Sequence, residues 1–391
     1  MKVLLFLAVL AVLSIATLAA DNPISSEPRG EHDLDSLPRR GGPDDNYVRP
    51  PHQFTDRPVV GVLTLPITVP SQRKIGVSSF ATSYQRWIEA GGARVVPIFY
   101  DSSKEELDFI LNRINGVFWT GGLVDFNPTE EDPEGSKYLA TTEYVWRHVV
   151  KENSNGNYYP LWGTCLGFER MFQLFANDVN GTWIREVDAE NFAINLGFTA
   201  DGWLSRLFGG MSYELFKQVA SPLGDLAFNN HGLGVHPDDF RASPAHEVFR
   251  ILSIDADRNG TQFVSTVEGR HFPFYGSQWH PEKAPWEWNP KHEIAHNEWA
   301  GTFSNYLGRY FVTECKYNKN QFESEYTLSK YLVENWPARP TGKFHKIFSA
   351  YSQITFFPSH KPVWVQRVEA LEAEGIAVSE EQAAEIMLTD L

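Results

Sequence analysis

Apolar residues follow two different patterns between residues 58 and 162. Short apolar runs, typical of buried strands, occur at 58–63, 94–98, 116–119 and 158–162. Helical spacing of apolar residues separates these runs, first at Phe80, Tyr84, Trp87 and Ile88, and then within 105–114 and 138–150. Strands that alternate with helices predict parallel βαβ units, so we expect an α/β fold with a mostly parallel central sheet and helices on both faces. Strand-like patterning returns at 263–267 and 273–279.

The two ends of the chain follow neither pattern. Residues 1–20 combine a basic start, a short apolar run and small residues, which predicts a secretory signal peptide cut after Ala19 or Ala20. Residues 21–57 are rich in Pro, Gly, Asp and Arg without apolar periodicity, so we expect a flexible leader. One large domain should then occupy 58–357. The C-terminal tail, 358–391, becomes rich in Ala and Glu, which favours a short surface helix or a disordered end.

Composition and short motifs limit the partners and the cellular compartment that we expect for the protein. The net charge of −15 disfavours nucleic acid and anionic membranes as partners, and no segment after the signal peptide is apolar enough to span a bilayer. Two N-x-[ST] triplets, at Asn180 and Asn259, could carry glycans in the secretory route. We therefore expect a lysosomal, vacuolar or extracellular protein.

The most specific motif surrounds Cys165. This residue stands between Gly163 and Gly167, where a predicted strand meets the amphipathic stretch 168–175. A strand-turn-helix corner exposes the side chain at its apex, and the amides and dipole of the following helix favour a thiolate there. The alternative is a small hydrophobe buried at a turn. With only two cysteines, a disulfide to Cys315 would consume this thiol, so we expect both to be free.

A cysteine nucleophile needs a base, and the end of the last predicted strand supplies one. In an extended segment His280 and Glu282 would point to the same side, with Pro281 holding the backbone extended. Glu282 could then orient the His280 ring and stabilise its charged form, as in a catalytic triad. The alternative is an ordinary surface loop.

Acyl transfer also requires hydrogen-bond donors for an oxyanion. The amide of Leu166 lies at the corner itself. Gly121 or Gly122, at the end of the strand predicted at 116–119, could supply a second amide, although a plain turn explains this pair equally well. No cluster of Cys, His and Asp has metal-ligand spacing, so we infer no metal.

These motifs together resemble one family. The stretches 163–169 and 278–285 are similar to the γ-glutamyl hydrolases, within the class I glutamine amidotransferase-like superfamily, and the resemblance spans roughly 57–357. Glutaminases of that superfamily usually carry Gln where this chain has Glu169, whereas the 283–285 segment, Lys-Ala-Pro, is typical of the hydrolases.

The resemblance implies a flavodoxin-like three-layer sandwich, a nucleophile at Cys165, a general base and proton donor at His280 and a third member at Glu282. It also implies that His231, which local sequence alone would make a structural loop histidine, lies near the substrate. The implied reaction is hydrolysis of poly-γ-glutamyl folates and antifolates through a γ-glutamyl thioester, without a cofactor. The family suggests a homodimer.

Two other functions stay open on the sequence. A glutaminase, or another γ-glutamyl amide hydrolase without folate preference, would use the same residues. A secreted binding protein that kept the fold without turnover is the alternative from another class. A papain-like protease fits less well, because the order and context of the cysteine differ.

Overall fold

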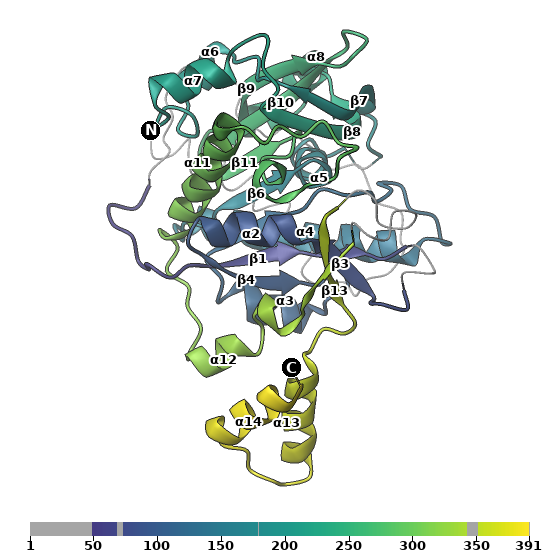
Figure 1. Cartoon of the computed structure of the whole chain (residues 1–391), viewed down its shortest axis with the longest axis vertical. Coiled ribbons are helices and arrows are strands. Elements are labelled where there is room, and N and C mark those ends of the chain that lie inside the picture. The colour runs from purple at the N-terminus through teal and green to yellow at the C-terminus, as the bar shows by residue number, and fades with distance from the viewer. Residues whose placement is uncertain (1–48, 69–72, 179, 342–350, 391) are drawn as a thin grey trace.

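The computed structural model describes residues 49–68, 73–178, 180–341 and 351–390, and a seven-stranded sheet forms its centre (Figure 1). In spatial order the strands are β4 (Arg94–Ile98), β1 (Val59–Leu63), β5 (Gly116–Trp119), β6 (Leu161–Thr164), β11 (Phe274–Ser277), β10 (Gln262–Gly269) and β9 (Phe249–Ala256). The first five are parallel, while β10 runs antiparallel to both of its neighbours. The predicted mostly parallel α/β sheet is thus confirmed.

Helices cover both faces of this sheet. One face carries α3 (Lys104–Leu111), α4 (Pro133–Ser154) and α5 (Leu166–Phe175), whose apolar residues share a hydrophobic core with Val59 and Leu63. The other face carries α2 (Thr82–Ala90) and α11 (Glu298–Cys315), packed with Val60 and Val62. Because alternate residues of a strand point to opposite faces, β1 contributes to both cores.

The strand order sets the position of any site. From β1 the chain crosses to β4 on one side and then returns to β5 on the other, so the order reverses next to β1. In open α/β sheets, ligands bind beyond the carboxyl ends of the strands at such a switch point. The residues that follow β5, β6 and β11 are therefore the ones that can form a site.

Several predicted boundaries differ from the structure, and two of the differences have a clear cause in strand pairing. The strand predicted at 158–162 begins at Leu161, because parallel pairing of Leu161 with Val117 and Phe274 starts there. Phe80, assigned by spacing to a helix, belongs to β3 (Ser78–Ala81), which pairs with β13 (Gln353–Phe357). Pairing across such a separation in sequence leaves no local signal.

Smaller elements surround the main sheet. A four-stranded sheet has the order β12 (Ala338–Pro340), β13, β3 and β2 (Leu65–Pro66), and β7 (Ile184–Ile194) pairs with β8 (Ala227–Val235). The short helices are α6 (Ala200–Trp203), α7 (Tyr213–Val219), α8 (Pro237–Ala242), α9 (Ala245–Val248), α10 (Lys283–Trp286), α12 (Glu325–Ser329) and the 3-10 turn η1 (Val333–Asn335).

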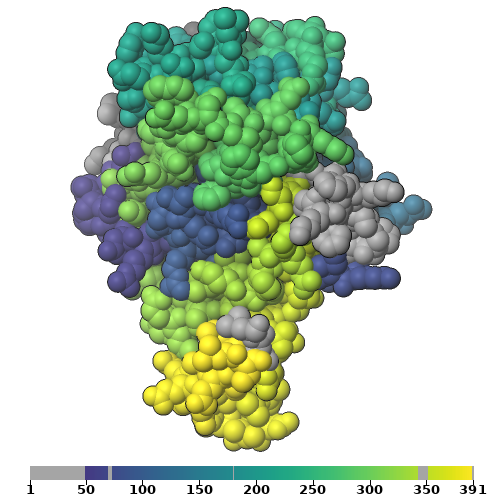
Figure 2. Space-filling view, in the orientation of Figure 1, coloured from purple at the N-terminus to yellow at the C-terminus, as the bar shows by residue number. Residues whose placement is uncertain are grey.

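The C-terminal tail forms two helices, α13 (Val363–Ala373) and α14 (Glu380–Asp390). They pack on each other through Trp364, Val365, Val368 and Ala383. Figure 2 shows this hairpin, in yellow, projecting from the lower end of the molecule. The tail is therefore more ordered than the short surface helix or disordered end that its composition suggests.

The N-terminal predictions fall largely outside the described residues. The signal peptide and most of the leader belong to 1–48, which the structure does not describe. Residues 49–57 contain no helix or strand, yet they contact the end of α11: the amide of Phe54 donates to the Lys316 carbonyl (2.8 Å), and Arg49 pairs with Glu314 (2.5 Å). Within the described ranges, no helix has the length and apolar character to cross a membrane.

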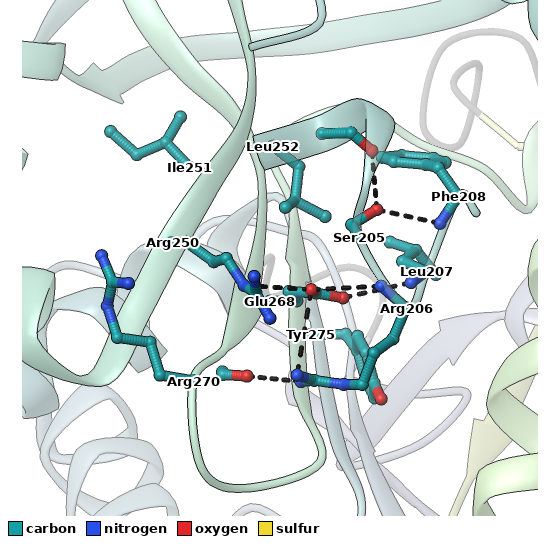
Figure 3. A network of polar contacts seen from close by, with 12 residues as sticks. Ser205, Arg206, Leu207, Phe208, Arg250, Ile251, Leu252, Glu268, Arg270 and Tyr275 are labelled. Carbon is teal, nitrogen blue, oxygen red and sulfur yellow. Dashed lines mark hydrogen bonds and ion pairs between the residues drawn. The ribbon is translucent and has the colours of Figure 1, made fainter. Parts of the chain in front are cut away.

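A buried ion network joins the segment after α6 to the antiparallel end of the sheet (Figure 3). The Glu268 carboxylate, on β10, is fully buried and accepts hydrogen bonds from the backbone amides of Arg206 (3.2 Å) and Leu207 (3.1 Å). The Arg250 Nε atom lies 3.2 Å from Glu268 Oε1. The Arg206 guanidinium also bonds to the Gly269 carbonyl oxygen. One carboxylate thus fixes a loop and two strands.

Candidate active site

Cys165 occupies the sharp corner between β6 and α5. Its φ of 53° is positive, a conformation that non-glycine residues rarely adopt outside constrained sites. Both flanking glycines are required by close approach: a Cβ on Gly163 would lie 2.5 Å from the Gly167 carbonyl oxygen, and one on Gly167 would collide with the Trp119 carbonyl oxygen. The Cys165 amide donates to the Ser277 carbonyl (2.8 Å), which ties the corner to β11. The predicted strand-turn-helix geometry is present, but the Cys165 side chain is buried rather than exposed at the apex.

His280 and Glu282 meet as the sequence predicts, but by a different local geometry. His280 Nδ1 lies 2.8 Å from Glu282 Oε1, and both side chains are buried. The segment is not extended: Glu282 is in an αR conformation (φ −78°, ψ −16°) at the start of α10. A turn, rather than strand alternation, therefore brings imidazole and carboxylate together.

Gly121 is the point at which these groups converge. A Cβ added to Gly121 would lie 2.8 Å from His280 Cε1 and 3.0 Å from Cys165 Cβ. Imidazole and thiol thus flank the same glycine, at the adjoining carboxyl ends of β5, β6 and β11. Gly122, by contrast, faces Leu65 and lies turned away from this point.

Burial controls the charge of both the Cys165 thiol and the His280 imidazole. It raises the pKa of the Cys165 thiol, and Glu169 raises it further, while Lys283 and the Leu166 amide oppose them. Burial also lowers the pKa of His280, as does Lys283, and Glu282 counters this. The helix terminus was expected to favour a thiolate, but burial outweighs it. The arrangement therefore holds a neutral thiol beside a neutral imidazole, which can take the proton as the sulfur attacks.

Tyr84, on α2, is a site residue that the sequence did not reveal. Its hydroxyl accepts a hydrogen bond from the Gly121 amide (2.9 Å) and lies 3.4 Å from His280 Nδ1. In this arrangement the Gly121 amide serves Tyr84, so an oxyanion could use that amide only after the hydroxyl has moved. The helical spacing of Tyr84 marked it merely as a core position, which it also is.

Comparison with known proteins identifies the family and the enzyme class of the chain. The family model described as Peptidase C26 matches residues 58–196. γ-Glutamyl hydrolase B of Dictyostelium discoideum is 34% identical over 292 residues, covering 74% of this chain and 81% of its own length. The chain belongs to the γ-glutamyl hydrolase family. It is an enzyme, a hydrolase of the Peptidase C26 class.

Other family members match to a similar extent. The γ-glutamyl hydrolase of Homo sapiens is 30% identical, covering 78% of this chain and 92% of its own. γ-Glutamyl hydrolase 1 of Arabidopsis thaliana is 33% identical, covering 73% and 78%. Among solved structures, a putative GMP synthase subunit from Thermoplasma acidophilum aligns with 68% of this chain and 94% of its own, at 16% identity and a TM-score of 0.38.

Glu169 stands at a position where glutaminases usually carry Gln, and its side chain lies in a buried environment near Cys165. The carboxyl is buried one turn after Cys165 and accepts a hydrogen bond from Gln278 Nε2 (2.8 Å). Burial raises the pKa of Glu169 to about 7, against the smaller effect of Gln278. A group beside the thiol thus changes charge near neutral pH.

His231 is buried on β8, where each ring nitrogen lies near an oxygen atom of the same strand. Nδ1 lies 2.7 Å from the Leu233 carbonyl oxygen, and Nε2 lies 3.1 Å from Asn229 Oδ1. Burial lowers the pKa of His231 to about 4, so the ring is neutral at neutral pH. A neutral ring carries one N–H and donates it to one of these two oxygen atoms, and this bond within β8 fits a positioning role better than direct substrate contact.

The remaining predicted residues lie elsewhere. Asn180 and Asn259 are both exposed, in the turns after α5 and between β9 and β10. Cys165 and Cys315 are free thiols, and Cys315 is buried against Gly116, at the start of β5 rather than at the site. Across the described residues, no group of three His, Cys, Asp or Glu side chains could hold a metal ion.

Proposed function

We propose that this protein hydrolyses the γ-glutamyl bonds of poly-γ-glutamyl folates and antifolates, with Cys165 as nucleophile. The observation that carries the proposal is the convergence of Cys165, His280 and Glu282 beside Gly121, in a chain whose relatives are named γ-glutamyl hydrolases. The glutaminase alternative has weaker support, because Glu169 stands where glutaminases usually carry Gln.

The buried, neutral pair suggests the order of proton movements. His280 takes the thiol proton as the Cys165 sulfur attacks the γ-carbonyl, and Glu282 stabilises the imidazolium that forms. The Leu166 amide, and the Gly121 amide once Tyr84 has moved, donate to the oxyanion. His280 then returns the proton to the departing amine, leaving a γ-glutamyl thioester. Water, deprotonated by His280, hydrolyses the thioester and restores the thiol.

We further propose that the protein works in the secretory pathway, either in a lysosome or vacuole or outside the cell. The predicted signal peptide and the exposure of Asn180 and Asn259, which makes both triplets accessible to glycosylation, support this proposal. Glycosidase treatment of protein secreted by a eukaryotic host tests it: removal of two glycans is expected, and Asn180→Gln and Asn259→Gln should each remove one.

Product analysis tests the reaction directly. The chain from Asp21 onward is incubated with a folate pentaglutamate, and the products are separated by chromatography, with free glutamine as the comparison substrate. Shortened folates together with glutamate or glutamate oligomers are expected, and little release of ammonia from glutamine. Turnover of glutamine alone would favour the glutaminase, and no turnover of either would favour the binding protein.

A further inference from the structure

His292 is a histidine near the candidate active site with an unpaired ring nitrogen. It lies in the loop between α10 and α11, and its side chain is half-buried. Its Nδ1 atom is shielded from solvent, yet it forms no hydrogen bond to any described residue. Buried polar atoms are ordinarily paired, so an unpaired one requires an explanation. A ligand that bonds to Nδ1 would complete this environment.

The Phe228 ring, on β8, places His292 beside His280. The His292 ring stacks on this phenyl ring with centroids 5.7 Å apart, and the centroid of the His280 ring lies 6.4 Å from the same phenyl centroid. The Phe228 carbonyl oxygen also accepts a hydrogen bond from the His280 amide (2.8 Å). The two histidines therefore pack against one aromatic residue, and His292 belongs to the surroundings of the reacting groups.

Asn191, on β7, fixes the backbone on both sides of His292. Its side-chain amide donates to the Lys291 carbonyl oxygen (3.1 Å), and its Oδ1 atom accepts a hydrogen bond from the Glu293 amide (2.8 Å). Asn191 has a positive φ of 47°, a conformation that is uncommon in residues other than glycine. The Asn230 side chain stabilises this conformation by accepting from the Asn191 amide (3.0 Å). The loop therefore holds the imidazole in one place.

The charge of the surroundings selects the kind of ligand. Burial lowers the pKa of His292 to about 4, and the charges of Lys283 and His280 contribute to this shift. The free ring is therefore neutral at neutral pH. A carboxylate beside the ring would oppose these effects and favour the protonated form, and hydrogen bonds that involve a charged group are stronger than neutral ones. A carboxylate is thus the ligand class that this position fits.

We propose that His292 binds the α-carboxylate of the glutamate that departs when the γ-glutamyl bond is cleaved, an assignment that rests on the proposed function. His280 returns a proton to the departing amine, so the departing residue lies beside His280. In a γ-linked chain that residue is a glutamate, and its α-carboxylate is attached to the carbon that bears the amine. His292 is therefore a specificity residue that favours a departing glutamate over an amine without this carboxylate.

The test compares two substrates that differ only in that carboxylate. Pteroyl-γ-diglutamate releases glutamate, and pteroyl-γ-glutamyl-γ-aminobutyrate releases γ-aminobutyrate from the same γ-amide. The wild type should prefer the first substrate by about 30-fold in kcat/KM, which is the effect expected of a hydrogen bond to a charged group. In His292→Phe, which keeps a ring to stack on Phe228 and removes both nitrogens, the ratio should fall to within about threefold.

A matched control separates contact with the substrate from an effect on the fold. His296 lies on the same loop and stacks on Trp288, with ring centroids 3.9 Å apart. His296→Phe makes the same change outside the proposed contact, so it should leave the ratio of the two substrates unchanged. If His292→Phe slows both substrates equally, the preference does not depend on this imidazole, and the proposal is overturned.

Two further measurements test the proposal even if His292→Phe does not fold. Asn191→Gly permits the positive φ and removes the side chain that fixes the loop, so it should lower the ratio at least about threefold, and an unchanged ratio overturns the assignment. Equal hydrolysis of both substrates by the wild type also overturns the His292 assignment and leaves the proposed function standing. Absence of hydrolysis of both overturns the proposed function, and the assignment with it.

Discussion

Two clusters of charged side chains in the described part of the chain, one around Glu268 and one around Glu282, differ in how completely their buried carboxylates are hydrogen-bonded. Glu268 receives two backbone amides and lies within ion-pair distance of Arg206 and Arg250 (Figure 3). At the candidate active site, Glu282 and Lys283 are equally buried, yet Glu282 Oε2 and Lys283 Nζ have no hydrogen-bond partner among the described residues. Native proteins leave few such groups unpaired.

This difference indicates which cluster stabilises the fold and which one takes part in the reaction. A carboxylate with its acceptors filled has no capacity left for a ligand, so the Glu268 network fixes the loop after α6 and does little else. Incomplete pairing costs stability, and a protein retains it where substrate or a transition state completes the set. We therefore expect substitutions in the first cluster to change stability, and substitutions in the second to change turnover.

We expect the largest effect from substitution of Cys165, and we expect it in activity. A large loss of stability instead would contradict the difference between the two clusters. Cys165→Ser should lower kcat/KM at least about 10⁴-fold, because a serine hydroxyl is a far weaker nucleophile beside the same base. The free energy of unfolding should change little, since the substitution conserves size. Activity on a γ-glutamyl substrate and urea unfolding measure the two. Retention of more than about a tenth of wild-type kcat/KM would remove Cys165 from this role.

The second effect belongs to the structural cluster. Glu268→Ala leaves two partly buried guanidinium groups without their carboxylate, and breaking a buried pair in this way costs about 3–5 kcal/mol. The folded fraction should keep nearly normal kcat/KM at low temperature. Urea unfolding and active-site titration check this, and the exposed pair partner Glu323→Ala is the control. A loss of kcat/KM in the folded protein would contradict the separation of the two clusters.

Only some contacts of the two clusters can be predicted from the sequence, because the others join residues that are far apart along the chain. The Cys165 corner and the His280–Glu282 pair depend on neighbouring residues, so motif and spacing suffice. Tyr84 reaches Gly121 from another helix, and Glu268 meets Arg206 across a separation of 62 residues. Such contacts are set by tertiary packing and leave no local periodicity. The same holds for β3 with β13, and for residues 49–57 against α11.

The third effect is a pH dependence at the site. Burial raises the folded-state pKa of Glu169 to about 7, above the ordinary value of 4.5, so the folded protein favours the protonated acid. Stability from this group is present below pH 4.5 and is lost as the pH rises to about 7. Glu169→Gln, which cannot ionise, should therefore match the wild type at pH 4.5 and exceed it by about 3 kcal/mol above pH 7.

Unfolding of both proteins at pH 4.5, 6 and 7.5 measures this difference. The variant also removes a charge that raises the pKa of Cys165, so iodoacetamide should alkylate it faster at pH 7.5. A constant stability difference across this range would show that Glu169 does not titrate within it.

We expect the smallest effect, a loss of kcat/KM, from substitution of Glu282. This substitution tests most directly whether the two buried carboxylates differ in role. If Glu282 orients His280 and stabilises its imidazolium, the two residues act as one unit and their losses should not add. Glu282→Gln keeps the shape of the side chain and removes its charge, so it should lower kcat/KM by roughly 10- to 1000-fold, within what general acid–base catalysis contributes. His280→Ala should cost more, because the leaving amine then lacks a proton donor.

The double variant decides between a triad and a pair. It should be about as slow as His280→Ala alone when kcat/KM is measured on one γ-glutamyl substrate. Fully multiplicative losses would show that Glu282 acts independently of His280, as a group that holds the turn into α10. Glu282 would then resemble Glu268 in role, with Cys165 and His280 left as a dyad, and incomplete pairing of a buried carboxylate would no longer distinguish the two clusters.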